Sequence, residues 1–224
     1  MVWFPYQLII QMIKYKIKTF DNFFELEDLK ELTVYAKSLN SDDNINVFHN
    51  KIDLNNNIIS ATINKDLLIR LNKKYLEKAI SILKELNKKK VDLIDYSDFT
   101  IIKTKKNKKF PIHDDTFNKL LSGVVYLYPE KNAGTIFYNS KSGKDKNIIE
   151  WKINRAVFFS RVERETWHSY QADSSNDRIT VIFNLMTKEK NFKKVLDVEN
   201  KSYVIGKLRY KLNPYLFRYF NKVI

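Results

Sequence analysis

The chain has 224 residues, of which 44% are hydrophobic and 14% aromatic, which is enough for one domain with a sizeable core. It contains no cysteine, which excludes a disulfide scaffold, a thiolate zinc site and a cysteine nucleophile, and its only histidines are His49, His113 and His168. The formal net charge is +14, yet only seven of the 40 basic residues are arginine, the residue best suited to phosphate. We therefore interpret most of the charge as compositional drift over a solvated surface.

The first ten residues are apolar but lack the leading positive charges and the cleavage site of a signal peptide. No stretch reaches the roughly 18 apolar residues that a membrane span needs. We therefore expect a soluble, cytoplasmic protein. We find no internal repeat and no long linker, so residues 1–224 are predicted to form a single domain.

Helical periodicity dominates residues 1–97, which we interpret as a mainly helical N-terminal support. Asp21 is placed to cap a first helix that runs to about residue 39, and residues 40–57 read as loop with one short strand. Asn64 or Asp66 begins a second, stronger helix. Residues 88–90, all lysine, follow it with charge that suits a helix C-terminus.

Residues 98–187 consist of short β-branched and aromatic segments separated by turn residues. The predicted strands are 99–104, 110–113, 121–128, 135–138, 148–153, 156–159, 166–170 and 179–185. Strands in such a series with no helix between them favour a closed sandwich or jelly roll over a parallel α/β sheet. Residues 188–224 form a basic, aromatic C-terminal extension with a helix predicted over 214–223.

Two of the three histidines fall on predicted strands. His113 and Asp115 are two residues apart, so on an extended segment both can face one pocket while Asp114 points away. His168 follows 55 residues later on another strand. Two imidazoles and one carboxylate form the facial triad of non-haem Fe(II) oxygenases. Each histidine taken alone is equally explained as a core or surface residue.

Arg178 begins a strand that is otherwise rich in β-branched residues, ten positions after His168. A guanidinium buried there needs an anionic partner, because an unpaired buried charge is very unfavourable. A dicarboxylate that chelates the metal at one end would offer its second carboxylate to Arg178 in a bidentate pair.

From about residue 99 to residue 186 the chain resembles the Fe(II)/2-oxoglutarate-dependent oxygenase superfamily, and within it the prolyl-hydroxylase-like branch. The matching features, in order, are the His-x-Asp, the strand 124–127, the Gly-Thr-x-Phe of 134–137, the strand 157–159, His168 and Arg178. The resemblance implies a mainly β fold with flanking helices. That fold is a double-stranded β-helix (jelly roll) with N-terminal helical support and a catalytic core at 98–187.

The resemblance also implies roles. His113, Asp115 and His168 would bind Fe(II), and Arg178 would pair with the distal carboxylate of 2-oxoglutarate. Tyr126 would donate its phenol to that carboxylate, and Thr180, two residues beyond Arg178, is a further candidate. The implied co-substrate is O2, and ascorbate is a candidate reductant. Tyr126 is equally well explained as a core aromatic, and packing is the simpler explanation for Thr180.

Two positions depart from the oxygen-sensing prolyl hydroxylases: Lys103 stands where they carry tyrosine, and Asn184 where they carry an aromatic residue. The resemblance places both positions in the region around the acceptor. The resemblance therefore implies hydroxylation of an unactivated C–H bond more firmly than it implies a prolyl acceptor. A peptidyl side chain such as proline is the first candidate, and a sugar, a lipid-linked group or a small metabolite is the alternative.

Other functions remain open from the sequence. An inactive jelly-roll binding module is one. A basic protein that binds nucleic acid is another, resting on the net charge and the C-terminal segment. The double arginine pattern of the nucleic-acid demethylating branch of the superfamily is missing, because no arginine follows Arg178 until Arg209. Residues 207–222 interleave basic and aromatic side chains and could dock on a membrane surface, but we favour packing of their aromatics over the barrel. The charged residues at 161–164 are interpreted as a solvated turn, and His49 as exposed.

Overall fold

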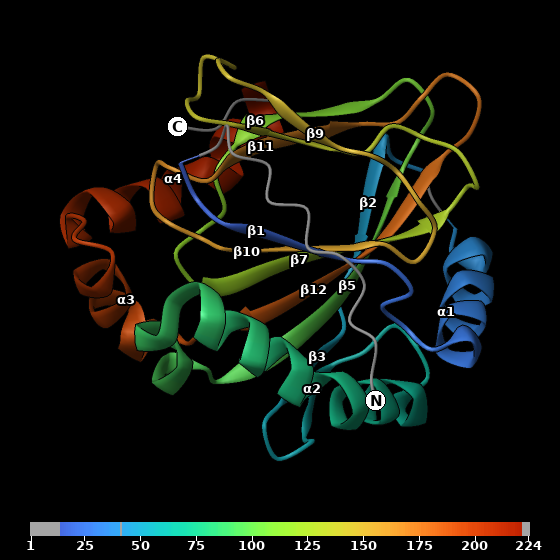
Figure 1. Ribbon diagram of the computed structural model, residues 1–224, viewed down its shortest axis with the longest axis horizontal. Coiled ribbons are helices and arrows are strands. Elements are labelled where there is room, and N and C mark those ends of the chain that lie inside the picture. Colours follow the sequence, from blue (N-terminus) through green and yellow to red (C-terminus); the bar gives the residue numbers. More distant parts are fainter. Residues whose placement is uncertain (1–13, 41, 221–224) are drawn as a thin grey trace.

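Two antiparallel sheets face one another in the computed structural model, which describes residues 14–40 and 42–220 (Figure 1). The major sheet has the order β1-β10-β7-β12-β5-β3-β4, with β2 also pairing with β5, and the minor sheet has the order β6-β11-β8-β9. This is the jelly-roll arrangement that the strand pattern predicts. The expectation of a closed sandwich is wrong in one respect, since the two sheets remain separate.

The strands are β1 (Ile17–Phe20), β2 (Ile45–Phe48), β3 (Lys51–Asp53), β4 (Ile58–Ser60), β5 (Tyr96–Thr104), β6 (Lys109–His113), β7 (Lys119–Tyr128), β8 (Thr135–Tyr138), β9 (Asn147–Ile149), β10 (Ala156–Ser160), β11 (Trp167–Gln171) and β12 (Arg178–Met186). The helices are α1 (Leu26–Ser38), α2 (Lys65–Asn87), α3 (Phe192–Val198) and α4 (Tyr203–Phe220), with 3₁₀ turns η1 (Lys88–Leu93) and η2 (Glu189–Asn191). None of the helices within the described residues is both long and apolar enough to cross a bilayer.

The predicted strands of the β-rich core are all present, with one shortened. β9 ends at Ile149 rather than continuing to residue 153, and the chain then turns at Asn154, which has a left-handed backbone (φ 62°). The N-terminal region departs further from expectation. It supplies β1–β4 to the major sheet, where one short strand was predicted, because these segments of three or four residues are stabilised by pairing with β5, β10 and each other.

The two predicted N-terminal helices are present, and one of the two predicted caps is correct. Asn64 Oδ1 accepts hydrogen bonds from the backbone N–H groups of Asp66 (2.7 Å) and Leu67 (3.2 Å), which caps α2. The Asp21 cap is wrong, because α1 begins only at Leu26. Asp21 instead pairs with Arg155 at 2.7 Å, and this guanidinium lowers the pKa of Asp21 to about 2.

The C-terminal helix begins earlier than predicted. α4 starts at Tyr203 rather than at residue 214, and Pro214 lies inside it. Residues 221–223 of the predicted helix, like the apolar residues 1–10, lie outside the described part of the chain.

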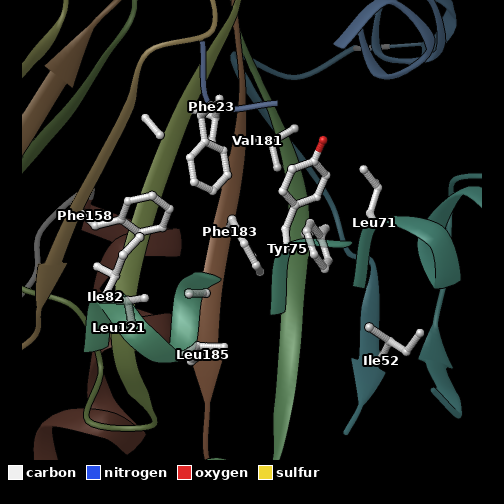
Figure 2. Packing of buried hydrophobic residues seen from close by; sticks show 14 of the residues in the cluster. Phe23, Ile52, Leu71, Tyr75, Ile82, Leu121, Phe158, Val181, Phe183 and Leu185 are labelled. Carbon is white, nitrogen blue, oxygen red and sulfur yellow. The ribbon is translucent and has the colours of Figure 1, made fainter. Parts of the chain in front are cut away.

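The alternation of β12 divides the molecule into two compartments. Val181, Phe183 and Leu185 face the helices (Figure 2). Phe183 stacks on Phe99 with ring centroids 4.2 Å apart. The intervening residues face the space between the sheets. α2 covers the helix-facing side with an apolar stripe that includes Leu71, Tyr75 and Ile82.

Gly123 on β7 is required by the closeness of this packing. A Cβ at this position would lie 2.3 Å from Cε1 of Phe158 and 2.4 Å from the carbonyl oxygen of Phe183. Both neighbours are fully buried, so neither can give way without disturbing the core.

We expect Phe183→Ala to lower the free energy of unfolding by about 3–5 kcal/mol, because it opens a cavity beneath α2. Urea denaturation measures the change. Val34→Ala is the matched control on α1, since Val34 is 70% exposed and its loss should cost less than ~0.5 kcal/mol. Equal effects of the two substitutions would contradict this assignment of the core.

Candidate active site

The structure brings His113, Asp115 and His168 together. His113 ends β6, and His168 lies directly opposite it on β11 in the antiparallel register. Their ring centroids are 4.2 Å apart, and one potential ligand atom from each of the three residues lies within 4.8 Å of the others. The triad therefore depends on the pairing of two strands that are far apart in the sequence.

In both imidazoles, Nε2 is the nitrogen that is left available to bind a metal ion. His113 Nδ1 lies 2.9 Å from the carbonyl oxygen of Pro111, and His168 Nδ1 lies 3.0 Å from that of Thr166. A carbonyl oxygen only accepts, so each Nδ1 carries the hydrogen and each Nε2 keeps its lone pair. Burial, reinforced by the neighbouring His168, lowers the pKa of His113 to about 3, so its ring is neutral at physiological pH.

Asp115 is held as an oriented carboxylate. Burial opposes its ionisation, but Lys119 and the two imidazoles outweigh that effect and hold the pKa of Asp115 below its usual range. Lys119 Nζ donates to Oδ1 at 2.6 Å and Ser122 Oγ donates to Oδ2. Two imidazoles and one carboxylate match the donor set of a ferrous ion, so the residues present fit this metal.

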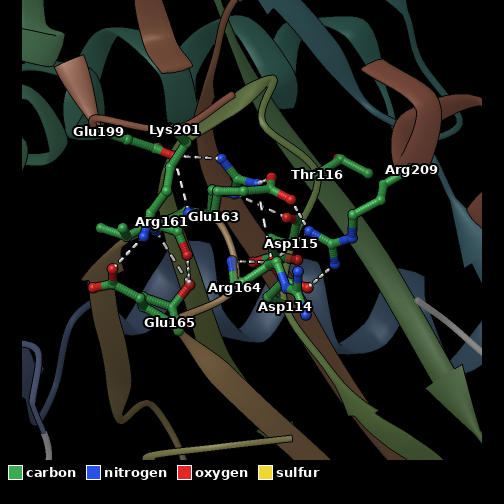
Figure 3. Close-up of polar contacts among 12 residues, drawn as sticks. Asp114, Asp115, Thr116, Arg161, Glu163, Arg164, Glu165, Glu199, Lys201 and Arg209 are labelled. Atoms are coloured by element: carbon green, nitrogen blue, oxygen red, sulfur yellow. Dashed lines mark hydrogen bonds and ion pairs between the residues drawn. The ribbon is translucent and has the colours of Figure 1, made fainter. Parts of the chain in front are cut away.

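Asp114 points away from the triad, as the alternation predicts. It lies in a buried network of charged side chains (Figure 3), where Arg209 of α4 donates to its two oxygens at 2.5 and 3.3 Å. The backbone N–H of Arg164 donates to the same carboxylate at 2.8 Å. α4 is thus anchored to the residue next to Asp115.

Two interpretations from the sequence are wrong within this network. Arg161 and Glu163 are not a solvated turn: Arg161 is fully buried, pairs with Glu163 and Glu199, and donates from Nε to the carbonyl oxygen of Asp115 at 2.9 Å. Lys90 is not a solvated helix-end charge either, because it is fully buried and binds Glu199 at 2.6 Å. Glu199, which pairs with both Arg161 and Lys90, is distant from them in the sequence, so no local pattern predicts these ion pairs.

A cavity of about 360 Å³ lies between the two sheets and contains the triad. It is lined by residues of β5, β7, β10 and β12 of the major sheet on one side and by β6, β8 and β11 of the minor sheet on the other. Asn213 and Pro214 of α4 also line it. The volume is in the range of small-molecule sites.

Arg178 lines this cavity and is 1% exposed. Its Nε and Nη2 have no hydrogen-bond partner among the described residues, and its guanidinium carbon lies 4.5 Å from the ring of Tyr170 and 5.2 Å from that of Trp151. Burial lowers the pKa of Arg178. A guanidinium that is desolvated and lacks an acceptor provides a fitting site for a carboxylate.

Tyr126 and Thr180, the other two residues predicted to contact the co-substrate, differ in their surroundings. The Tyr126 hydroxyl accepts from the backbone N–H of Thr135 at 2.9 Å and lies 3.0 Å from the Thr135 Oγ1, while its ring lies 5.6 Å from the guanidinium carbon of Arg178. Thr180 Oγ1 is buried with no partner in the described part of the chain. Their predicted contacts with the co-substrate stay predictions.

Sequence reasoning missed Tyr170, whose ring is the closest of three to Arg178. The signal was available, since Tyr170 is two residues beyond His168 on the same strand and therefore faces the same side. It also missed Lys119 and Ser122, which bind Asp115 from the following strand. The turn after His113 places these two side chains beside Asp115, and the sequence alone does not specify the geometry of that turn.

The predicted packing of the C-terminal aromatics is correct for only part of α4. Tyr210 packs against Phe117 and Phe192, with ring centroids 5.0 and 5.3 Å away. Tyr215 and Tyr219 are 65% and 68% exposed. Membrane association through residues 207–222 stays a prediction, and residues 221–222 lie outside the described part of the chain.

We expect His168→Ala to abolish binding of a divalent metal while leaving the protein folded, because the triad lies in the cavity rather than in the helix-covered core. Isothermal titration with Co(II) and circular dichroism measure the two effects. His49→Ala is the control, since His49 lies at the cavity but outside the triad. Retained Co(II) affinity in His168→Ala would contradict the metal site.

We expect Arg209→Met to lower the free energy of unfolding by about 3–5 kcal/mol, because it leaves the carboxylates of Asp114 and Glu163 buried without this cation. Chemical denaturation measures it. Lys211→Met is the matched control on the same helix, where the side chain is exposed and the change should be below ~0.5 kcal/mol. A cost as small as the control's would show that α4 is not anchored by this pair.

Comparison with protein-family models finds no match, and comparison with curated protein sequences finds no match either. Solved structures do match. A Pseudomonas putida prolyl-4-hydroxylase superposes with a TM-score of 0.54 at 12% identity, over 78% of this chain and 94% of that one. A 2OG-Fe(II) oxygenase family member from Burkholderia pseudomallei gives 0.53 at 12% identity, over 76% and 84%.

A third match is a prolyl hydroxylase from Trichoplax adhaerens, solved in complex with a peptide fragment of the hypoxia inducible factor oxygen degradation domain. Its TM-score is 0.55 at 11% identity, over 81% of this chain and 87% of that one. These structures confirm the predicted double-stranded β-helix fold and support the resemblance to the Fe(II)/2-oxoglutarate oxygenases and their prolyl-hydroxylase-like branch. At such low identity they establish the fold, and function has to be argued from the site.

Proposed function

We propose that this protein is an Fe(II)- and 2-oxoglutarate-dependent dioxygenase that hydroxylates an unactivated C–H bond. The observation that carries the proposal is the placement of Arg178. A buried guanidinium with two unpartnered nitrogens lines the same cavity as two imidazoles and a carboxylate. A metal-chelating dicarboxylate is the one class of ligand that satisfies both features at once.

His113, Asp115 and His168 would hold the iron through two Nε2 atoms and one carboxylate oxygen. When bound, Fe(II) with 2-oxoglutarate and O2 supplies oxidative decarboxylation to succinate and CO2 coupled to hydroxylation of the acceptor. Lys119 and Ser122 fix the orientation of Asp115, and the carbonyls of the two strands fix the imidazoles. This chain thus keeps the ligand set in place before the metal arrives.

Arg178 would bind the distal carboxylate of 2-oxoglutarate. The rings of Tyr126, Trp151 and Tyr170 surround the guanidinium and exclude water, which strengthens a charge-assisted pair. Thr180 Oγ1, buried and unpartnered among the described residues, is a second donor for the same anion.

The acceptor would enter past Asn213 and Pro214 of α4 and His49 near β2, which line the cavity. The first candidate is a peptidyl side chain such as proline, as in the peptide bound to the Trichoplax adhaerens enzyme. A sugar, a lipid-linked group or a small metabolite is the alternative.

Succinate release from 2-oxoglutarate by the Fe(II)-loaded protein, screened against such acceptor pools with and without ascorbate, tests the proposal. Binding of 2-oxoglutarate without any succinate would instead identify an inactive binding module.

We expect Arg178→Ala to weaken 2-oxoglutarate binding by ~30-fold or more, because truncating one partner of a desolvated charge pair costs ~2–5 kcal/mol at ~1.4 kcal/mol per decade. Titration of 2-oxoglutarate into the Co(II)-loaded protein measures it. Arg178→Lys should retain part of the affinity, since it keeps the charge and loses the fork. Metal affinity should not change.

Arg70→Ala is a control for loss of an arginine elsewhere, since Arg70 pairs with Asp28 on the helix-covered side. It should leave 2-oxoglutarate affinity unchanged. Unchanged affinity in Arg178→Ala as well would show that Arg178 is structural and that the co-substrate assignment is mistaken.

A further inference from the structure

The cavity has two ends, and the strand register places Arg178 at one of them. In the β5–β12 pair, Arg178 lies opposite Thr104, and Asn184 lies opposite Asp98. Six residues at a rise of ~3.3 Å separate the two ends by about 20 Å. A five-carbon diacid is far shorter than this, so the end marked by Asp98 and Asn184 is left for the acceptor.

The Asp98 end lies beside the triad. Gly123 on β7 donates its backbone N–H to Asn184 Oδ1 at 3.3 Å, and the adjacent Ser122 donates to Asp115. Asp98 and Asn184 both line the cavity. A group bound by Asp98 would therefore lie on the opposite side of the metal site from Arg178.

Asp98 is a buried carboxyl group without a cation. It is 5% exposed, and among the described residues no lysine or arginine nitrogen lies within 4.0 Å of it. Thr100 Oγ1 donates to Asp98 Oδ1 at 2.5 Å and lies 3.0 Å from Nδ1 of the exposed His49. One neutral hydroxyl does not balance a buried carboxylate.

The other buried carboxylates of this cavity and of the helix layer are matched. Asp28 binds Arg70 and Lys74, Asp114 binds Arg209, and Asp115 binds Lys119. Lys119 is therefore already engaged. Burial raises the pKa of Asp98, and the hydrogen bond from Thr100 and the charges of Lys51 and Lys119 only partly offset this effect.

We propose that Asp98 is the recognition residue for a protonated amine on the acceptor, with Thr100 and Asn184 beside it. This inference rests on the proposed function, which identifies the cavity as the acceptor site. An ammonium group supplies both the charge and the hydrogen-bond donors that the carboxylate lacks, and its binding restores the ionised form. The acceptor is thus an aliphatic compound or side chain that carries an amine near the carbon to be hydroxylated.

The test is calorimetric titration of the Co(II)- and 2-oxoglutarate-loaded protein with pentylamine, protonated at neutral pH, and with 1-pentanol as the uncharged probe. Pentylammonium should bind more tightly than pentanol in the wild type. Asp98→Asn, which keeps the shape, should weaken pentylammonium at least ~30-fold and leave pentanol unchanged. Asp197→Asn, which removes an exposed carboxylate on α3, should change neither.

Equal affinity for pentylammonium in the wild type and in Asp98→Asn would overturn the proposal, as would tighter binding of pentanol. Lys51 lies opposite Asp98 in the β3–β5 register. A gain of tenfold or more in pentylammonium affinity in Lys51→Met would show that Lys51 is the cation for Asp98, which also overturns it. Asp98→Glu, which keeps the carboxylate, should retain discrimination between the two probes. This variant separates the effect of the lost charge in Asp98→Asn from an effect of misfolding.

These binding measurements need no turnover. Failure to form succinate with intact discrimination between the probes would reject the oxygenase and keep the amine subsite. Succinate formation without that discrimination would keep the oxygenase and reject the subsite.

Discussion

The two-residue alternation of the major sheet is the constraint on which both the core and the site depend. On β12 the odd-numbered residues Val181, Phe183 and Leu185 pack beneath the helices, while Arg178, Ile182 and Asn184 face the cavity. A shift of one residue in the β5–β12 register would place the guanidinium in the hydrocarbon core and a phenylalanine in the cavity. Stability of the core therefore fixes the position of Arg178, the residue proposed to bind the co-substrate.

Burial of charge follows two patterns in this protein. Where the chain supplies both partners, as for Asp114 with Arg209 and Glu199 with Lys90, the charged groups connect elements and make no use of the cavity. Arg178 and Asp98 face the cavity instead and lack partners of opposite charge among the described residues. Since desolvation is unfavourable for either kind of group, the unmatched groups mark where ligand charge belongs. The contrast distinguishes ionisable residues that connect elements of the fold from those that we propose bind ligand charge.

The sequence predicted those parts of the fold and site that depend on local pattern. The strand periodicity located the β-rich core, and the i, i+2 spacing placed His113 and Asp115 on one side with Asp114 on the other. The helix cap at Asn64 follows from a short-range hydrogen bond. The Asp21 cap failed because a distant partner, Arg155, competed for the same carboxylate. Lys90 and Arg161 were misjudged for the same reason, since their partners come from residues far along the chain.

A jelly roll that only binds a ligand could contain Arg178, because any bound anion would satisfy it. It would have no reason to hold two imidazoles beside a carboxylate, each imidazole with its Nδ1 fixed by a backbone carbonyl oxygen. One potential ligand atom from each of the three residues lies within 4.8 Å of the others, and the lowered pKa of Asp115 keeps its carboxylate ionised. A divalent cation would be bound by all three groups together. The arrangement therefore favours the proposed metal-dependent chemistry over ligand storage.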